Sequence, residues 1–365
     1  MNATLPIVEN DSARIAAARA QYAADRDELR RRLDTEFPEC RDHWRGPFTD
    51  SGAATDQMAW TVVGYDGDFP VFGIVFRVEK KVFVGTWHSR CDLLSANSKL
   101  RKLPGRAGRY RAIGLALAPA FYSGKELCSW RTAGCTMACN GFWSGMNVTI
   151  STRLALIGRA ILFNWYRDIF RSKLRRELAN FAKLCKRTGV RPAVRLNVSS
   201  DIVWERLFSE LFAEFPTIHF LDYTKALPKH RPTLPANYQL VHSFNERTTA
   251  ADVWDIVQSG RNVVIAFDSA YAPSRGLWGA LPKSVRFTDD SGRDFTLPVV
   301  NGDRHDLRLH DMDGRGVVVG LHGKSGRQRV EKSVESGFMI RHPDGAKLRT
   351  VSRFIGTAHV HRPAK

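Results

Sequence analysis

The sequence has few cysteines, no long apolar run and fewer acidic than basic residues. Six cysteines in 365 residues are too few for a scaffold held together by disulfide bonds. The most apolar stretch, 153–166, contains Arg153 and Arg159, so it lacks the uninterrupted run of roughly 20 residues that spans a membrane. The first residues also lack the basic start and apolar segment of a secretory signal. These absences predict a cytoplasmic protein.

The charge balance is strongly basic, with 55 Lys and Arg against 37 Asp and Glu and a net charge of +18. Such an excess favours a polyanionic partner such as nucleic acid, because neutralising phosphates releases counterions. A genome that favours arginine would produce the same balance, so both explanations stay open. The segment 97–111 is either a solvated loop or a phosphate-contacting loop. Its candidate nucleic-acid contacts are Lys99, Arg101, Lys102, Arg106, Arg109 and Arg111.

Periodicity divides the chain into three predicted parts. Residues 1–111 combine a helix over 10–34, antiparallel strands at 57–67 and 69–87, and the basic segment. Residues 112–282 alternate short apolar strands with helical segments, which predicts an α/β core with a parallel β/α barrel, complete or incomplete. One long helical stretch, 152–187, is expected to break near 164–168. Residues 283–365 form a turn-rich, β-rich tail whose clearest strand is 316–323.

Polar residues follow four strands of the predicted barrel. They are Asn197, Ser199, Ser200 and Asp201; Asp222, Tyr223, Thr224 and Lys225; His242, Ser243, Asn245 and Glu246; and Asp268 and Ser269. Because the carboxyl ends of parallel strands share one rim, this pattern predicts a polar cavity there. Turns and helix caps also need Ser, Asp and Asn, so the role of any single residue stays open. The candidate catalytic residues are Asp201, Tyr223, Lys225 and Glu246, and the candidate cofactor-binding residues are Asn197, Ser199, Ser243 and Asn245.

Half of the cysteines lie in one glycine-containing loop directly after the first strand of the predicted barrel. Cys128, Cys135 and Cys139 have the spacing C-x6-C-x3-C. Thiolates are soft, anionic donors that bind Zn²⁺ or iron–sulfur clusters. A structural zinc site needs a fourth ligand, and no Cys or His close in the sequence supplies one. The loop therefore favours a cluster over zinc, and cysteines without a metal stay an alternative.

A second candidate metal site lies in the tail, at 299–326. Carboxylates and imidazoles recur there at short intervals: Asp303, His305, Asp306, His310, Asp311 and Asp313. Side chains at alternating positions of a strand share a face, where they would hold a divalent cation. Arginines interleave with them, so an ion-pair network is the competing interpretation.

Several motifs, taken in their order along the chain, resemble those of the gene-product-88 type family of phages and plasmids. They include LALAPAFYSGKELCSWRTAGCTMAC, VRLNVSSDIVWE, FLDYTK, PANYQLVHSFNE, GRNVVIAFD and VNGDRHDLRLHD, between about 110 and 342. The strand rhythm and the cysteine loop are distantly similar to radical S-adenosylmethionine enzymes. This resemblance implies that Cys128, Cys135 and Cys139 hold a [4Fe–4S] cluster, with S-adenosylmethionine on its open iron and across the strand ends.

Two functions follow from these observations. One is an iron–sulfur, radical S-adenosylmethionine-like enzyme of a mobile genetic element, with nucleic acid as a possible substrate class. The other is a non-enzymatic or replication-associated nucleic-acid-binding protein, in which the cysteines hold a structural metal or nothing. The two are not exclusive, because an enzyme acting on nucleic acid satisfies both.

Overall fold

The computed structural model describes residues 58–78, 81–96, 109–120, 122–139, 149–268, 281–323 and 327–341, with isolated residues and short pieces elsewhere. The chain divides into two compact units. Unit 1 comprises Met1–Cys91, Phe121–Glu126 and Ile150–Ile169, and unit 2 comprises Asp92–Ala120, Leu127–Thr149 and Phe170–Lys365. The helix expected over 10–34 lies mostly outside the described residues, as does most of the basic segment. The three domain ranges expected from the sequence stay predictions.

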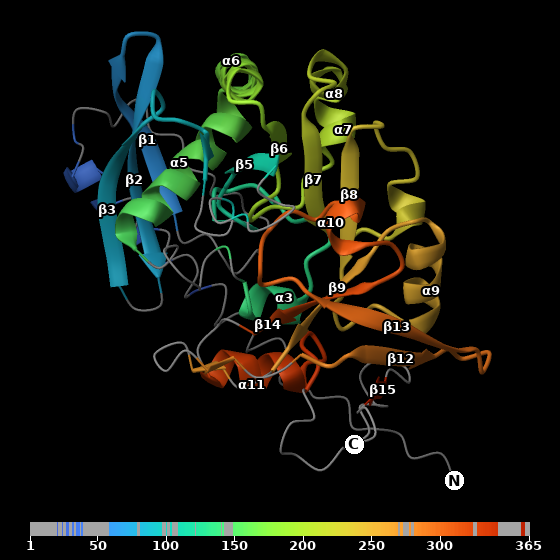
Figure 1. Cartoon of the computed structure of the whole chain (residues 1–365). Helices are drawn as coiled ribbons and strands as arrows, with labels where there is room; N and C mark the ends of the chain where they lie inside the picture. The colour runs from blue at the N-terminus through green and yellow to red at the C-terminus, as the bar shows by residue number, and fades with distance from the viewer. Residues whose placement is uncertain are drawn as a thin grey trace. The chain divides into compact units, whose positions relative to one another are not determined.

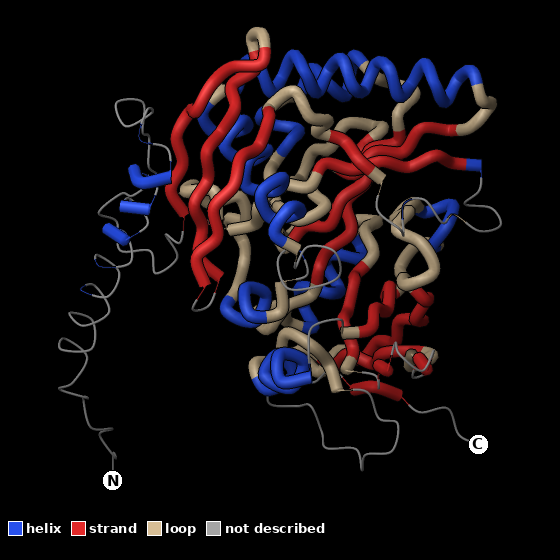
Figure 2. Tube along the Cα trace, turned by 90° about the vertical axis from the view of Figure 1, so that its left-hand side faces the viewer, coloured by secondary structure: helices blue, strands red, loops and turns tan. Residues whose placement is uncertain are grey.

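Unit 1 contains an antiparallel sheet of β1 (Met58–Asp66), β2 (Phe69–Val78) and β3 (Lys81–His88), seen side by side in Figures 1 and 2. These strands confirm the antiparallel unit predicted from the β-branched and aromatic runs. Trp60, Phe72 and Trp87 form an aromatic cluster, with Trp60 edge-on to Phe72 and Phe72 stacked on Trp87. The helix α5 (Ile150–Trp165) packs on β3. Trp165 extends the aromatic cluster, with its ring centroid 5.9 Å from that of Trp60.

The predicted helical stretch 152–187 is two helices, as expected. The first is α5, and α6 (Arg167–Arg187) follows after Tyr166. Among the described residues, no helix is both long and apolar enough to cross a membrane.

The core of unit 2 is a ten-stranded sheet with the order β15-β12-β13-β14-β9-β8-β7-β6-β5-β4. The strands from β5 to β13 in this order are parallel, and antiparallel pairs lie at both margins. The strand bounds are β4 (Leu94–Ser95), β5 (Tyr110–Leu115), β6 (Arg191–Arg195), β7 (His219–Thr224), β8 (Tyr238–Ser243), β9 (Val263–Phe267), β12 (Ser284–Thr288), β13 (Asp294–Asn301), β14 (Val318–His322) and β15 (His359–His361). The short strands β10 (Tyr271–Ala272) and β11 (Leu277–Trp278) pair separately. The predicted mixed α/β fold with a mostly parallel sheet is confirmed.

A closed barrel is not formed by the described residues. The sheet is open, with β4 and β15 at its two edges. The reason lies after β9, where the chain makes the antiparallel pair β12–β13 before returning to β14. Because β13 has an antiparallel neighbour on its outer side, the parallel ladder stops there. Of the two expected forms, a complete or an incomplete barrel, the described residues do not form the complete one, and strands from the predicted core and tail share one sheet.

Helices cover one face of this sheet. The helices after β6 are α7 (Trp204–Leu207) and α8 (Ser209–Glu214), and α9 (Ala250–Gln258) follows β8. Phe212 of α8 packs on Phe220 and Tyr238, with ring centroids 4.8 Å apart in both pairs. Val253 of α9 joins the buried cluster of Val263, Ile265 and Phe267. This apolar burial fixes which side chains of the strands face the helices.

The chain's own segment 302–313, which includes α10 (His310–Asp313), covers the other face of β5–β8. Its Leu307 and Leu309 pack with Tyr110, Ala112, Ala193 and Leu221. Polar bonds fasten it as well, since Arg195 donates to Asp306 at 2.8 Å and Gln239 donates to the Arg308 carbonyl at 3.0 Å. The tail motif therefore belongs to the core of unit 2.

Replacing Gly158 of α5 by Ala should destabilise the protein, although Ala is intrinsically the better helix former. A Cβ at this position would lie 2.3 Å from the Trp87 ring. We expect the free energy of unfolding to fall by about 1–3 kcal/mol, the usual cost of overpacking, measured by urea denaturation.

The matched control is the same substitution in a Trp87→Leu background, where the ring is absent. There Gly158→Ala should be neutral or stabilising by up to about 1 kcal/mol. An equal loss in both backgrounds would contradict the steric explanation.

Candidate functional site

The cysteine loop is fastened to the carboxyl end of the sheet by backbone contacts. The Leu127 amide donates to the Ala120 carbonyl at 3.3 Å, and the Asp201 amide donates to the Leu127 carbonyl at 2.8 Å. The Ala120 amide also points at the Cys128 sulfur, 3.4 Å away. These bonds tie the loop after β5 to the loop after β6.

Cys135 lies in α3 (Ala133–Met137), a short helix whose start is capped by Thr132. The Thr132 hydroxyl accepts a hydrogen bond from the Cys135 amide at 3.2 Å. Glu246, from the loop after β8, accepts bonds from the Gly134 amide and the Thr132 hydroxyl, both at 2.7 Å. Both oxygens of this predicted catalytic carboxylate are therefore engaged in holding the cysteine helix.

The C-terminal helix α11 (Arg327–Glu335) and the segment after it pack against α3. A Cβ on Gly134 would lie 2.6 Å from the Phe338 Cβ and 2.8 Å from the Ser336 hydroxyl, so only glycine fits here. The segment then joins the sheet, where the Ile340 amide donates to the Ala266 carbonyl at 2.9 Å. The cysteine helix thus rests on residues that are two hundred positions away in the sequence.

Lys225, directly after β7, brings the cysteines into one electrostatic environment. Lys225 is partly buried, and its ammonium group hydrogen-bonds with Cys135 and interacts with Asp201 and Cys128. Burial lowers the pKa of Lys225, but these three interactions outweigh it, so the pKa is raised. Cys128 in turn interacts with Cys139, and burial raises the pKa of its thiol. Lys225 thus interacts with two of the three predicted ligands, Cys128 and Cys135, and the third, Cys139, interacts with Cys128.

The three cysteines are ligands of the type that binds an iron–sulfur cluster, because they are thiols from one loop at the edge of a parallel sheet. They are not preassembled as a ligand set: within the described ranges, no three Cys, His, Asp or Glu side chains are arranged to hold a metal ion. With its pKa raised, the Cys128 thiol is protonated at neutral pH. Binding a metal would replace that proton and draw the sulfurs together.

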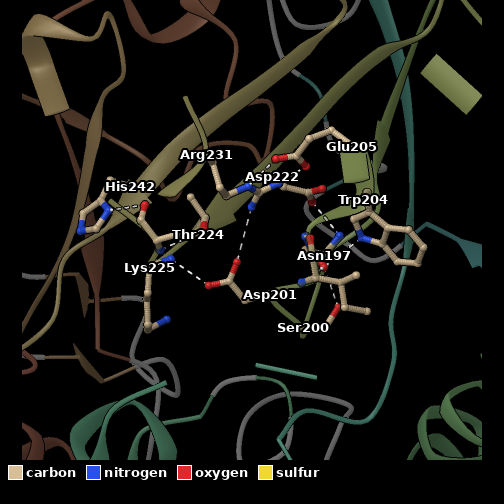
Figure 3. A network of polar contacts seen from close by, with 12 residues as sticks. Asn197, Ser200, Asp201, Trp204, Glu205, Asp222, Thr224, Lys225, Arg231 and His242 are labelled. Carbon is tan, nitrogen blue, oxygen red and sulfur yellow. Dashed lines mark hydrogen bonds and ion pairs between the residues drawn. The ribbon is translucent and has the colours of Figure 1, made fainter. Parts of the chain in front are cut away.

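Asp201 connects Lys225 to a buried ion pair (Figure 3). Its Oδ2 accepts a hydrogen bond from the Lys225 backbone amide at 2.8 Å, and its Oδ1 lies 3.7 Å from Nη1 of Arg231. Arg231 binds Glu205 through two hydrogen bonds of 2.8 and 2.6 Å. Burial raises the pKa of Asp201, and the charges of Lys225 and Arg231 oppose that effect. Asp201 therefore fixes the backbone that carries Lys225.

The predicted cofactor-binding residues hold their own loops. The Asn197 side-chain oxygen accepts bonds from Ser200, from the Ile202 amide and from the Trp204 indole, at 2.9, 2.9 and 3.0 Å. Ser199 donates to the Leu117 carbonyl at 2.6 Å.

In the loop after β8, Asn245 accepts a bond from the Arg247 amide at 2.9 Å, which closes a turn. Ser243 ends β8 and is partly buried. Cofactor binding by Asn197, Ser199, Ser243 and Asn245 stays a prediction.

Tyr223 lies among the charges beneath the tail segment. The Arg195 guanidinium sits 4.6 Å from the centre of its ring, and burial raises the pKa of Tyr223 to about 12. Lys225, two residues later, contacts the cysteines. The structure therefore places these two predicted catalytic residues in different surroundings.

The acidic side chains of the tail are engaged with basic or hydroxyl groups. Asp306 pairs with Arg195, and Asp313 binds Arg308 at 3.0 and 2.9 Å. Asp303 binds His322 at 2.6 Å and Asp311 accepts from the Tyr110 hydroxyl at 2.8 Å, in contacts that fasten the segment to β14 and β5. No metal-binding group occurs among the residues that are described. Of the two interpretations of this motif, the described structure shows the ion-pair network.

Two members of the buried network were missed by the sequence reasoning. Arg231 and Glu205 lie in a loop and a helix whose apolar pattern gives no hint that they meet. Asp222 was seen only as one of many polar strand ends. It accepts bonds from the Asn197 amide at 2.7 Å and the Tyr238 hydroxyl at 2.9 Å, and burial raises its pKa to about 7.

Of the predicted nucleic-acid contacts, Arg109 and Arg111 are described and exposed. They lie at the amino end of β5, whereas the cysteine loop follows its carboxyl end. Lys99, Arg101, Lys102 and Arg106 lie outside the described residues.

Fold and site together define an α/β protein with an open, mostly parallel sheet and a cysteine-bearing polar edge. The chain belongs to the gene product 88 family, whose model matches residues 92–342. The match begins where unit 2 begins, so the antiparallel strands β1–β3 lie outside it. No curated protein and no solved structure matches the chain.

The Asp222→Asn variant should become more stable relative to wild type as the pH rises. The folded pKa of Asp222 is about 7, above its ordinary value of 3.8, so wild type loses stability between these two values as the pH increases. Asn does not ionise and escapes this loss. Between about pH 5 and pH 8 the difference in free energy of unfolding should move by roughly 2–3 kcal/mol in favour of Asp222→Asn.

Urea denaturation of both proteins at each pH measures this difference. His242 and Asp313 also titrate, but they are present in both proteins and cancel. A difference that does not change with pH would contradict the raised pKa.

Proposed function

We propose that the chain is an iron–sulfur enzyme of a mobile genetic element, similar to radical S-adenosylmethionine enzymes. Cys128, Cys135 and Cys139 would bind the cluster at the carboxyl edge of the parallel sheet. The observation that carries this proposal is the shared environment of the three thiols, with Cys128 interacting with Cys139 and with Lys225, and Lys225 with Cys135.

The location of the cysteines supports an enzyme more than a structural metal site. In open α/β sheets, ligands bind outside the carboxyl ends of the strands, and the cysteine loop follows the carboxyl end of β5. Bound there, a [4Fe–4S] cluster would supply one-electron chemistry and an open iron for S-adenosylmethionine. The protein's part would be to hold the ligands.

Specific residues suit that holding role. Glu246 fixes α3 and therefore Cys135. Asp201 fixes the backbone of Lys225, whose ammonium group lies beside Cys135 and offsets negative charge gathered at the thiolates. A cluster with three thiolates carries net negative charge, so a cation at this point favours the loaded state.

Iron reconstitution tests the proposal. After anaerobic reconstitution the full-length protein should contain about four irons per chain and should be brown. A Cys128→Ala, Cys135→Ala, Cys139→Ala variant should bind none, because the soft anionic donors are gone. Iron analysis and the visible absorption spectrum give the readout.

Cys91→Ala is the matched control, because Cys91 is an exposed cysteine outside the loop. It should retain the full iron content. A colourless, iron-free wild-type protein after reconstitution would rule out the cluster. Zinc bound in its place would favour the structural alternative.

Nucleic-acid binding is the second candidate function, favoured by the net charge of +18. The ion pairs of the basic side chains indicate which of them would be available to a nucleic acid. On α6, Arg171 pairs with Glu210, Arg175 with Glu214 and Lys173 with Glu177, so these cations are already offset. Arg109 and Arg111 at the amino end of β5 are the better candidates, because they are exposed.

An Arg109→Ala, Arg111→Ala variant should bind duplex DNA more weakly and with a shallower salt dependence. Each lost phosphate contact reduces the slope of log K against log salt by about 0.9. Fluorescence anisotropy at several salt concentrations measures that slope. The control is Arg171→Ala, Arg175→Ala, which should change it little. An unchanged slope in the first variant would exclude these two arginines as phosphate contacts.

A further inference from the structure

The ammonium group of Lys225 has no carboxylate partner among the described residues, although it is partly buried. Four buried cations of unit 2 do have one, whereas the buried Arg261 donates to the Arg231 carbonyl instead. Lys173, Arg195, Arg231 and Arg308 lie 3.3, 2.8, 2.6 and 2.9 Å from the nearest oxygen of their acidic partners. Removing a cation from water costs free energy unless an anion or several acceptors compensate. Lys225 therefore differs from these four structural cations.

Asp201, whose charge acts on Lys225, also contacts other groups. Its Oδ2 accepts from the Lys225 backbone amide, and its Oδ1 faces Arg231. Figure 3 shows the side chain of Lys225 extending away from Asp201, out of the buried network. Asp201 thus fixes the start of this side chain and leaves its end for another partner.

The ammonium group at the end of the Lys225 side chain has donors for further hydrogen bonds. An ammonium group has three donors, and among the described residues the one group that hydrogen-bonds with it is the thiol of Cys135, a weak acceptor. The Phe338 ring, whose centre is 5.9 Å from Nζ, adds an aromatic wall. A cation with unused donors beside an aromatic ring suits a small anionic oxygen group.

We propose that Lys225 binds an anionic oxygen group of the substrate, a carboxylate or a phosphate, next to Cys135. This deepens the proposed function, on which it rests, by assigning acidic compounds as the substrate class. Lys225 would hold the substrate by charge at the cysteine-bearing edge.

Titrations with inorganic phosphate and with acetate test this proposal on full-length protein without added iron. Binding is followed by NMR of each anion at constant ionic strength, set with sodium chloride. Wild type and Lys225→Arg should bind at least one of the two anions, and Lys225→Met should lose that binding. The matched control is Lys229→Met, which removes an exposed lysine four residues later and should bind as wild type does.

The two anions separate the two sources of charge. Binding of phosphate alone indicates that the substrate group is a phosphate ester, and binding of acetate alone indicates a carboxylate. Binding of both indicates a site that recognises negative charge without distinguishing the two groups. Equal binding by wild type and Lys225→Met, or no binding of either anion by wild type, would overturn the proposal.

A second measurement uses wild type alone and so does not depend on the folding of a variant. Trace reductive methylation, analysed by peptide mass spectrometry, compares Lys225 with Lys229. At an anion concentration of about twice Kd, methylation of Lys225 should slow about threefold relative to chloride, and Lys229 should be unaffected. Equal slowing of both lysines would contradict a specific site.

Both measurements are made without iron, so they can be interpreted whether or not the cysteines bind a cluster. Failure of iron reconstitution would reject the proposed function and leave the anion result standing. Anion binding that does not depend on Lys225 would reject the present inference and leave the cluster untouched.

Discussion

The buried ion pair between Arg231 and Glu205 organises the polar edge of unit 2. Its two side chains are 0% and 6% exposed, so breaking it would leave a charge without a partner inside the protein, which is strongly destabilising. Arg231 also reaches the Tyr238 hydroxyl at 3.3 Å and approaches Asp201. Through Asp201 the pair determines where the backbone of Lys225 lies. The position of the site's ammonium group thus depends on a helix–loop contact made before β8.

The cysteine loop depends on the same kind of remote support. α3 is too short to be stable by itself, because a first helical turn costs more than it gains. Glu246 and the segment around Phe338 provide the contacts that hold it. Residues after β5, after β8 and after α11 therefore meet at one place, and the loop cannot take its shape before the sheet has assembled.

Local patterns predicted much of the fold. The apolar runs gave the strands β1–β3 and β5–β9, and the change of pattern near 164–168 gave the break between α5 and α6. They did not show that the sheet stays open, since closure depends on which strand pairs with β13. They also did not show that the tail 302–313 packs on the sheet. So many charged residues in one segment suggest exposure to solvent. In the structure, however, Asp306 and Asp313 are buried, and they pair with Arg195 and Arg308 respectively.

The candidate site, like the fold, was predicted only in part from the sequence. The sequence by itself determined that three cysteines follow the first parallel strand and that polar residues end the next strands, because both follow from spacing and the geometry of parallel sheets. Only the tertiary structure decided their roles in the fold. Glu246 and Asn197 hold loops, whereas Lys225 reaches the thiols without a carboxylate partner among the described residues. Such assignments depend on distances between segments far apart in the chain, and local sequence patterns do not determine those distances.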